Sequence, residues 1–315
     1  MPEPTLLAVP NISEGRDERT IAAVRHAIES KRVRLLDAHR DPDHHRSVFT
    51  VAGPPRSLCD AVLAGARVAV ECIDVMSRTE RDPIEAGQHP HVGAIDVAPI
   101  VYLEESARGA ACAEALVLAD RIGEELGVPV FLYGELTAGP DRQETSRSQL
   151  RRGGAIGLAQ RIDAGAAPSG APAGDRPELR PDFGPARIHP SAGATLVAAR
   201  PPLVAFNLEL ASPADLKDAR RIAATIREGG SEGLPGVRAI AIRLSDGTAQ
   251  VSMNVERPFE VSLAEVLEAV VRHAPVACAE LVGLAPRAAL RGFPADVEIL
   301  GFDPARHVIE NALGS

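Results

Sequence analysis

The chain has 315 residues, enough for two ordinary domains or one large one, and its 45% hydrophobic and 24% charged content is that of a globular protein. The net charge of −9 and the 3% aromatic content argue against a nucleic-acid-binding protein, which needs a basic surface or a stacking platform. We find no apolar stretch of membrane-spanning length, and the polar start of the chain does not predict a signal peptide.

The first half of the chain alternates predicted strands and helices. Short apolar runs bounded by turn residues predict strands at 6–9, 33–38, 47–52, 95–103 and 130–133. Apolar residues at helical spacing predict helices at 21–30, 54–73 and 107–126. The order therefore begins βαββαβ, the split unit of ferredoxin-like folds, and continues with one further helix and strand.

The second half of the chain repeats this order. Predicted strands lie at 203–210, 237–244, 248–255 and 279–282. Ser212 and Pro213 are typical of the start of a helix, and a capping box formed by Ser262 and Glu265 predicts the start of a second one. Residues 245–247, with the sequence Ser-Asp-Gly, predict a hairpin between the middle two strands.

The sequence thus predicts a mixed α/β (α+β) protein built from two tandem ferredoxin-like βαββαβ subdomains. Residues 163–181 have the alanine-, proline- and glycine-rich composition of a linker. We therefore expect an N-terminal subdomain at 1–165, a linker at 166–181 and a C-terminal subdomain at 182–315.

Four cysteines stand singly in apolar surroundings, without the paired spacing of a metal site. Cys59, Cys72, Cys112 and Cys278 are therefore expected to be small core residues in a reducing compartment. The cytoplasm is the expected location.

The most unusual motif of the sequence is the run from Gly87 to Gly93, which reads Gly-Gln-His-Pro-His-Val-Gly. It lies in a link of residues 74–94, whereas the corresponding link of the second half is short, and a long loop inside a compact unit is usually functional or disordered. Pro90 restricts the backbone of the residue before it, so His89 is held in few conformations and suits a general acid/base role. The alternative is that both histidines of the motif are solvated loop residues.

A metal site is a second interpretation of the same histidines. Two histidines at a spacing of two can both bind a metal, and a further cluster of possible ligands is formed by Asp41, Asp43, His44 and His45. This cluster also lies where a hairpin between two predicted strands would place polar turn residues. The metal interpretation is therefore the less favoured one.

Three further segments could bind anions. Residues 183–194 contain Arg187 and His189 between two glycines that allow a close backbone approach. Residues 10–16 precede a helix whose first N–H groups could bind an anion, and the arginine-rich stretch at 142–152 could steer a polyanionic ligand. Each also has a structural interpretation, as an ordered loop, a helix cap and a solvated surface respectively.

In this order, these segments resemble the formiminotransferase domain of the glutamate formimidoyltransferase family, which occurs alone or fused to a cyclodeaminase. The similarity spans nearly the whole chain, and the matching segments are 9–15, 87–96, 125–135, 181–194, 203–207 and 281–286. The resemblance implies two ferredoxin-like subdomains with tetrahydrofolate, often as a polyglutamate, bound in a cleft between them. It also implies a homodimer that acts on small molecules.

The resemblance further implies a reaction and its residues. The formimino group of N-formimino-L-glutamate moves to N5 of tetrahydrofolate, which is a co-substrate, and no metal is required. His89 matches the catalytic histidine of the family and would act as general acid and base. The residues that match the folate-binding segment are Gly184, Pro185, Ala186, Arg187, Ile188, His189, Pro190, Ser191, Ala192 and Gly193. Arg16, Arg46 and Arg187 are candidate partners for substrate carboxylates.

Three residues depart from the pattern of the family. His91 stands where an arginine is expected, Ala192 where an aromatic residue is expected, and His39 where a carboxylate is expected. All three lie in the predicted site, so the one-carbon donor could differ. The alternatives are a related folate-dependent formimino or formyl transferase with another donor, a folate-binding protein without catalysis, and, less favoured, a metallohydrolase.

Overall fold

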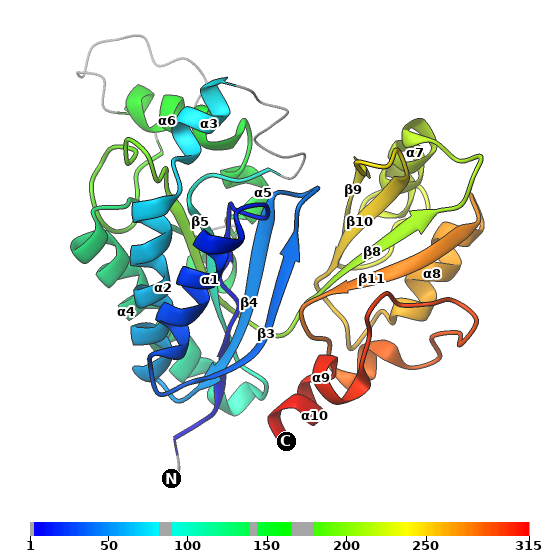
Figure 1. Ribbon diagram of the computed structural model, residues 1–315, viewed down its shortest axis with the longest axis horizontal. Helices are drawn as coiled ribbons and strands as arrows, with labels where there is room; N and C mark the ends of the chain where they lie inside the picture. The colour runs from blue at the N-terminus through cyan, green and yellow to red at the C-terminus, as the bar shows by residue number, and fades with distance from the viewer. Residues whose placement is uncertain (1–2, 82–89, 139–143, 166–178, 315) are drawn as a thin grey trace. The chain divides into compact units, whose positions relative to one another are not determined.

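A computed structural model describes residues 3–81, 90–138, 144–165 and 179–314 of the chain. The chain divides into two compact units, a first unit of residues 1–201 and a second unit of residues 202–315, and each contains its own sheet (Figure 1). The predicted mixed α/β class is therefore confirmed.

The first unit is built on a mixed sheet of seven strands. They are β1 (Leu6–Ala8), β2 (Asn11–Ile12), β3 (Arg34–Asp41), β4 (Arg46–Gly53), β5 (Ile95–Val101), β6 (Val130–Leu132) and β7 (Thr195–Arg200). The short strands β1 and β2 follow each other along one row of the sheet, between β4 and β5. β3 pairs with the outer side of β4, while β7 pairs in parallel with both β5 and β6.

Three long helices cover one face of this sheet (Figure 1). They are α1 (Glu18–Glu29), α2 (Ser57–Cys72) and α4 (Arg108–Leu126), and their apolar faces pack on buried strand residues such as Phe49 and Ile100. The shorter α3 (Val75–Arg81), α5 (Arg147–Leu150) and α6 (Gly154–Gly165) and the 3-10 turns at Glu105–Ala107 and Gly134–Thr137 complete the described part of the unit. The three long helices were predicted because their periodic apolar residues are the ones that the sheet buries.

The second unit has the predicted βαββαβ order. It consists of β8 (Val204–Leu210), α7 (Leu216–Ile226), β9 (Val237–Arg243), β10 (Ala249–Val255), α8 (Leu263–Val271) and β11 (Val276–Val282). The strands lie in the order β11-β8-β10-β9 and all pair antiparallel. The capping box of Ser262 and Glu265 is present at the start of α8. A 3-10 turn (Arg287–Leu290), α9 (Pro304–His307) and α10 (Ile309–Gly314) form the tail.

The boundary between the units differs from the expected one. Residues 182–201 were assigned to the C-terminal subdomain, but they belong to the first unit because β7 pairs with β5 and β6 there. Leu196, Val197 and Ala198 of this strand are fully buried in the first sheet. Residues 166–178 of the expected linker lie outside the described residues.

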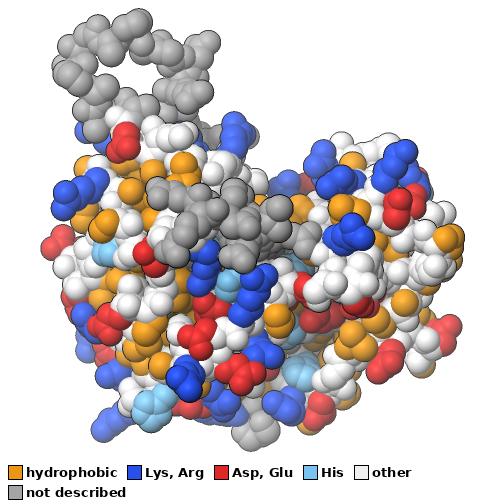
Figure 2. Space-filling model, turned by 45° about the horizontal axis from the view of Figure 1, so that its top comes forward, with side chains coloured by type: hydrophobic (Ala, Val, Ile, Leu, Met, Phe, Trp, Pro, Cys, Tyr) orange, Lys and Arg blue, Asp and Glu red, His pale blue; other side chains and the backbone are white. Residues whose placement is uncertain are grey.

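Basic and acidic side chains are interspersed on the described part of the face drawn in Figure 2. This distribution agrees with the acidic net charge and differs from the basic surface that nucleic-acid binding requires. Among the described residues, no helix combines the length and apolar character needed to cross a membrane.

The start of α2 is capped by a residue of another helix. Its N-cap residue, Arg56, has a φ of 67° and forms no side-chain cap. Instead, the buried carboxylate of Glu114 on α4 accepts a hydrogen bond of 2.9 Å from the backbone N–H of Cys59. The negative charge also lies at the positive end of the helix dipole. Glu114 therefore both joins the two helices and satisfies an N–H group that α2 cannot satisfy itself.

We predict that Glu114→Ala lowers the free energy of unfolding by about 1–2 kcal/mol, because the Cys59 N–H loses its acceptor. Denaturant unfolding followed by circular dichroism measures the change. Glu124→Ala, at an exposed position of the same helix, is the control and should change the stability by less than about 0.5 kcal/mol. Equal effects of the two substitutions would contradict a capping role of Glu114.

Candidate functional site

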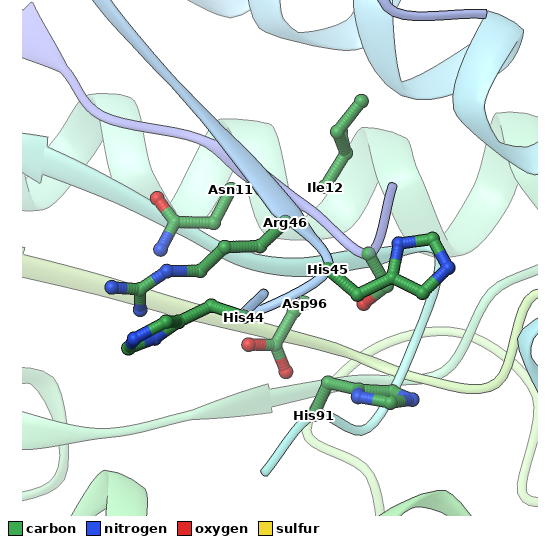
Figure 3. Close-up of a pocket in the computed structure, with 8 residues that line it drawn as sticks. Asn11, Ile12, His44, His45, Arg46, His91 and Asp96 are labelled. Atoms are coloured by element: carbon green, nitrogen blue, oxygen red, sulfur yellow. The ribbon is translucent and has the colours of Figure 1, made fainter. Parts of the chain in front are cut away.

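A pocket of the first unit opens where β2, β4 and β5 lie side by side (Figure 3). Asn11 of β2 pairs with residues of both β4 and β5, so side chains from all three strands meet here. The residues that line the pocket are Asn11, Ile12, Ser13, His44, His45, Arg46, His91 and Asp96. In Figure 3 the side chains of Asn11, His44 and Arg46 extend to one side, while the rings of His45 and His91 lie on the other.

The histidine motif ends in this pocket. His89 itself lies outside the described residues, but the segment that follows it is anchored at two points. The Val92 N–H donates a hydrogen bond of 2.9 Å to the Asp96 carboxylate, and the Ser13 hydroxyl donates one of 2.7 Å to the Gly93 carbonyl. Asp96 is buried and also accepts a hydrogen bond from the buried guanidinium of Arg151. The chain is therefore held rigidly within three residues of His89.

The folate-binding segment predicted by resemblance pairs with this anchored segment. The Ala94 N–H donates to the Ala192 carbonyl at 2.8 Å, and the Ala194 N–H donates to the Val92 carbonyl at 3.0 Å. Between these bonds Gly93 faces Gly193, and a Cβ atom on Gly93 would lie 1.9 Å from the Ala194 carbonyl oxygen. The structure thus brings together two predicted site segments that are about a hundred residues apart in the sequence.

Within the folate-binding segment, a tight turn is closed by His189. Its Nδ1 atom accepts hydrogen bonds from the N–H groups of Ser191 (3.3 Å) and Ala192 (3.0 Å), and burial lowers its pKa. Arg187 is exposed, whereas Ala192 is buried in the core. Gly184 was predicted to allow a close approach of the backbone. It makes this approach to the protein's own backbone, because Gly184 packs on Gly123 of α4.

A buried carboxylate binds the backbone N–H groups that precede α1. Glu14 accepts hydrogen bonds from the N–H groups of Arg16 (2.8 Å) and Asp17 (3.0 Å) and pairs with Arg78 at 2.8 Å. Burial raises the pKa of Glu14, but these hydrogen bonds outweigh it and lower the pKa overall. The side chain of the N-cap residue Asp17 accepts a hydrogen bond of 3.0 Å from the Arg19 N–H, so the chain caps α1 itself, as the structural interpretation proposed.

His45 lies against this carboxylate in a strained conformation. Its φ is 51°, in the left-handed region that few non-glycine residues adopt. Nδ1 accepts a hydrogen bond of 3.1 Å from the Gly15 N–H. Burial, assisted by the positive charge of Arg78 and opposed by Glu14, lowers the pKa of His45 to about 4. His45 is therefore neutral near pH 7, with its proton on Nε2.

The possible metal-ligand cluster at 41–45 does not converge on one point. Asp41, Asp43, His44 and His45, all of which the structure describes, do not place three ligand atoms within 4.8 Å of one another. Asp41 instead accepts a hydrogen bond of 2.8 Å from the His44 N–H and closes the turn between β3 and β4. The turn interpretation of this run is thus the one that the geometry favours.

The arginine-rich stretch has a partly structural role. Arg151 is buried in its ion pair with Asp96, so it holds the loop and is not part of a solvated surface. Arg142 lies outside the described residues. Glu14, Arg78 and Asp96 could not be identified from the sequence, because their importance depends on contacts with residues distant in the chain.

We predict a pH-dependent stability that depends on His45. Because its pKa is about 4 in the folded protein and 6.5 in the unfolded chain, the unfolded chain binds the additional proton between these values. The stabilisation is complete above pH 6.5 and is lost as the pH falls toward 4, by about 1–3 kcal/mol in total. Urea unfolding at several pH values in this range measures the loss.

The matched variant for this experiment is His45→Asn, because asparagine tolerates the left-handed conformation and does not titrate. Its free energy of unfolding should fall less steeply between pH 6.5 and 4.5 than that of the wild type. Identical slopes for the two proteins would show that His45 is not buried in its neutral form. The pKa of Glu14 is lowered in the folded protein from its usual value of 4.5, so its protonation decreases the stability further only below about pH 4.5.

Residues 5–200 match the family described as the formiminotransferase domain, N-terminal subdomain. The chain is 33% identical over 313 residues to a glutamate formimidoyltransferase of Streptococcus pyogenes, and this similarity covers 97% of both proteins. It is 34% identical over 290 residues to a glutamate formimidoyltransferase of Thermoplasma acidophilum, covering 90% of this chain and 88% of the relative. It is also 38% identical over 300 residues to half of the formimidoyltransferase-cyclodeaminase of Sus scrofa.

Proposed function

The chain belongs to the formiminotransferase family, and from this membership we propose that it is a glutamate formimidoyltransferase. Its donor is N-formimino-L-glutamate, and its acceptor is N5 of tetrahydrofolate. The observation that carries the proposal is the similarity over 97% of the chain to a relative of that name, together with the pairing of the two predicted site segments.

The proposed reaction has two steps. N5 of tetrahydrofolate attacks the formimino carbon, and neutral His89 takes the proton that N5 loses. The tetrahedral intermediate then breaks the bond between this carbon and the glutamate nitrogen, and the imidazolium of His89 returns the proton to the leaving amine. Atoms and charges balance without a metal, so we propose a metal-independent reaction with tetrahydrofolate as co-substrate.

The hydrogen bonds around Gly93 support this division of roles. An acyl-type transfer gains most from two reactants held in register, and here the segment after His89 is paired with the segment proposed to bind folate. His89 precedes Pro90, and the next residues are fixed by Asp96 and Ser13. A proton-transfer group carried by such a loop needs little reorganisation during the reaction.

The identity of the donor is the part of the proposal that depends most on the departures from the family. His91 lines the pocket, and Ala192 is buried in the core. Ala192 therefore provides no aromatic surface for the pterin. Comparing formiminoglutamate with formiminoglycine and 5-formyltetrahydrofolate as donors separates the proposed function from a related transferase.

His89→Ala should lower kcat at least about 100-fold while folinate binding and stability are retained, because general acid/base catalysis contributes about 10²–10⁴-fold. The rate is measured with formiminoglutamate and tetrahydrofolate in the presence of a chelator. His26→Ala, at an exposed position of α1, is the matched control and should keep full activity. An unchanged rate in His89→Ala would reject the role of this histidine. Folinate binding without consumption of any donor would instead indicate a folate-binding protein.

We further propose that the enzyme is a cytoplasmic homodimer and that both units are ferredoxin-like. The single cysteines support a reducing compartment. The βαββαβ order of the second unit, and the order β3-β4-β1/β2-β5 within the first sheet, support the fold assignment.

A further inference from the structure

Arg46 is the most unusual side chain of the pocket. It stands at the start of β4, and its Nε atom is enclosed without a hydrogen-bond partner among the described residues. Burial lowers its pKa to about 10. The half-buried guanidinium retains its charge even so, and a charge partly removed from water is costly unless a partner or a ligand compensates it.

The two carboxylates that interact with Arg46 also bind other groups. Arg46 interacts through space with two carboxylates, Asp41 and Asp96, and with two other guanidiniums, Arg147 and Arg151. Asp96 is already paired with Arg151, and Asp41 accepts its hydrogen bond from the backbone of the turn. Both carboxylates thus bind groups other than Arg46, and the Arg46 guanidinium can bind a carboxylate of a ligand.

The other groups of the pocket are suited to the same ligand. Asn11, together with the histidines of the β3–β4 turn, lines the pocket next to Arg46 (Figure 3). Their side chains can form hydrogen bonds, and His45, which is neutral near pH 7, does not repel a positively charged formimino group. His91, two residues from His89, lines the pocket as well. The Cα atoms of two residues that are two positions apart lie at most about 7 Å from each other, and the glutamate chain of the donor can cover this distance.

The structure separates Arg46 from the other two candidate arginines. Arg16 is exposed and donates a hydrogen bond of 3.1 Å to the Pro42 carbonyl, and Arg187 is exposed in the folate-binding segment. Neither lines the pocket. Of these three candidates, Arg46 is the one that is half-buried and that lines the pocket at the end of the histidine motif.

We propose that Arg46 binds a carboxylate of the amino-acid donor in this pocket and thereby determines the specificity for formiminoglutamate. The inference rests on the proposed function, since it names the group that holds its donor. Arg46 is a binding residue in this scheme, because it contacts the donor away from the carbon that is transferred. A planar guanidinium can hold a carboxylate through two parallel hydrogen bonds.

The first test compares Arg46→Gln with the wild type in steady-state kinetics and in folinate binding. Loss of a charge-assisted pair should raise KM for formiminoglutamate about 10- to 100-fold, while the folinate Kd changes less than about twofold. Arg46→Lys keeps the charge but not the two-point geometry, so its KM for formiminoglutamate should lie between those of the wild type and Arg46→Gln. It also keeps the test valid if the glutamine variant does not fold. Arg25→Gln, an exposed change of the same charge on α1, should behave as the wild type.

The second test uses N-butylformamidine, a donor that keeps the formimino group and lacks both carboxylates. The wild type should prefer formiminoglutamate strongly by kcat/KM, and Arg46→Gln should lose at least nine-tenths of this preference. If the preference is unchanged, or if Arg46→Gln weakens folinate binding while the donor KM is constant, the proposal is overturned. The latter result would assign the pocket to the glutamate carboxylate of folate.

Calorimetric titration with L-glutamate, the product that carries the same carboxylates, separates this inference from the proposed function. A wild type that transfers no formimino group rejects the proposed function. The carboxylate site is still supported if L-glutamate binds to the wild type and at least tenfold more weakly to Arg46→Gln. Equal binding of L-glutamate to both proteins, or to neither, overturns the site at Arg46.

Discussion

The close contact of Gly93 with Gly193 is the constraint on which the rest of the first unit depends. No side chain fits at this crossing, because a Cβ atom on either residue would lie within 2.5 Å of a carbonyl oxygen of the opposite segment. Glycine at both positions allows the hydrogen bonds on either side of the contact to form. Through these bonds the segment after His89, the proposed folate segment and strand β7 become one rigid body.

Buried carboxylates stabilise this arrangement, and each of them binds backbone N–H groups. Glu14 binds the N–H groups of Arg16 and Asp17 before α1, Asp96 binds that of Val92, and Glu114 binds that of Cys59 at the start of α2. A buried carboxylate is tolerated because several donors satisfy it, and removing one of these donors leaves an uncompensated group. The polar interior of the first unit is therefore largely fixed before any ligand binds. The Nε atom of Arg46 is one of several buried polar atoms that lack a hydrogen-bond partner among the described residues, and the Tyr133 hydroxyl and the Arg151 Nε atom are others. Arg46 differs from Tyr133 and Arg151 because it lines the pocket.

Much of the fold could be predicted from local sequence patterns. The hairpin at 245–247 and the capping box of Ser262 depend only on neighbouring residues, as do the long amphipathic helices. Strand β7 was not predicted because residues 195–200 become a strand only by pairing with β5, almost a hundred residues earlier in the chain. The histidine motif could be recognised from its composition, whereas the states of His45 and Arg46 depend on burial, which the sequence does not encode locally.

The parallel pairing of β5 with β7 also has a consequence for how the chain folds. Val97 pairs with Leu196, so the first sheet closes a loop of almost a hundred residues before it is complete. Closing so long a loop is entropically costly and slows folding. Until the last residues of the first unit are synthesised, one edge of β5 is unpaired and β6 has no partner strand among the described residues. A chain that ends at residue 165 would leave β5 with an unpaired edge, and exposed edges of this kind pair with other molecules. Residues 195–200 thus cover this edge of β5 and also supply the partner strand of β6.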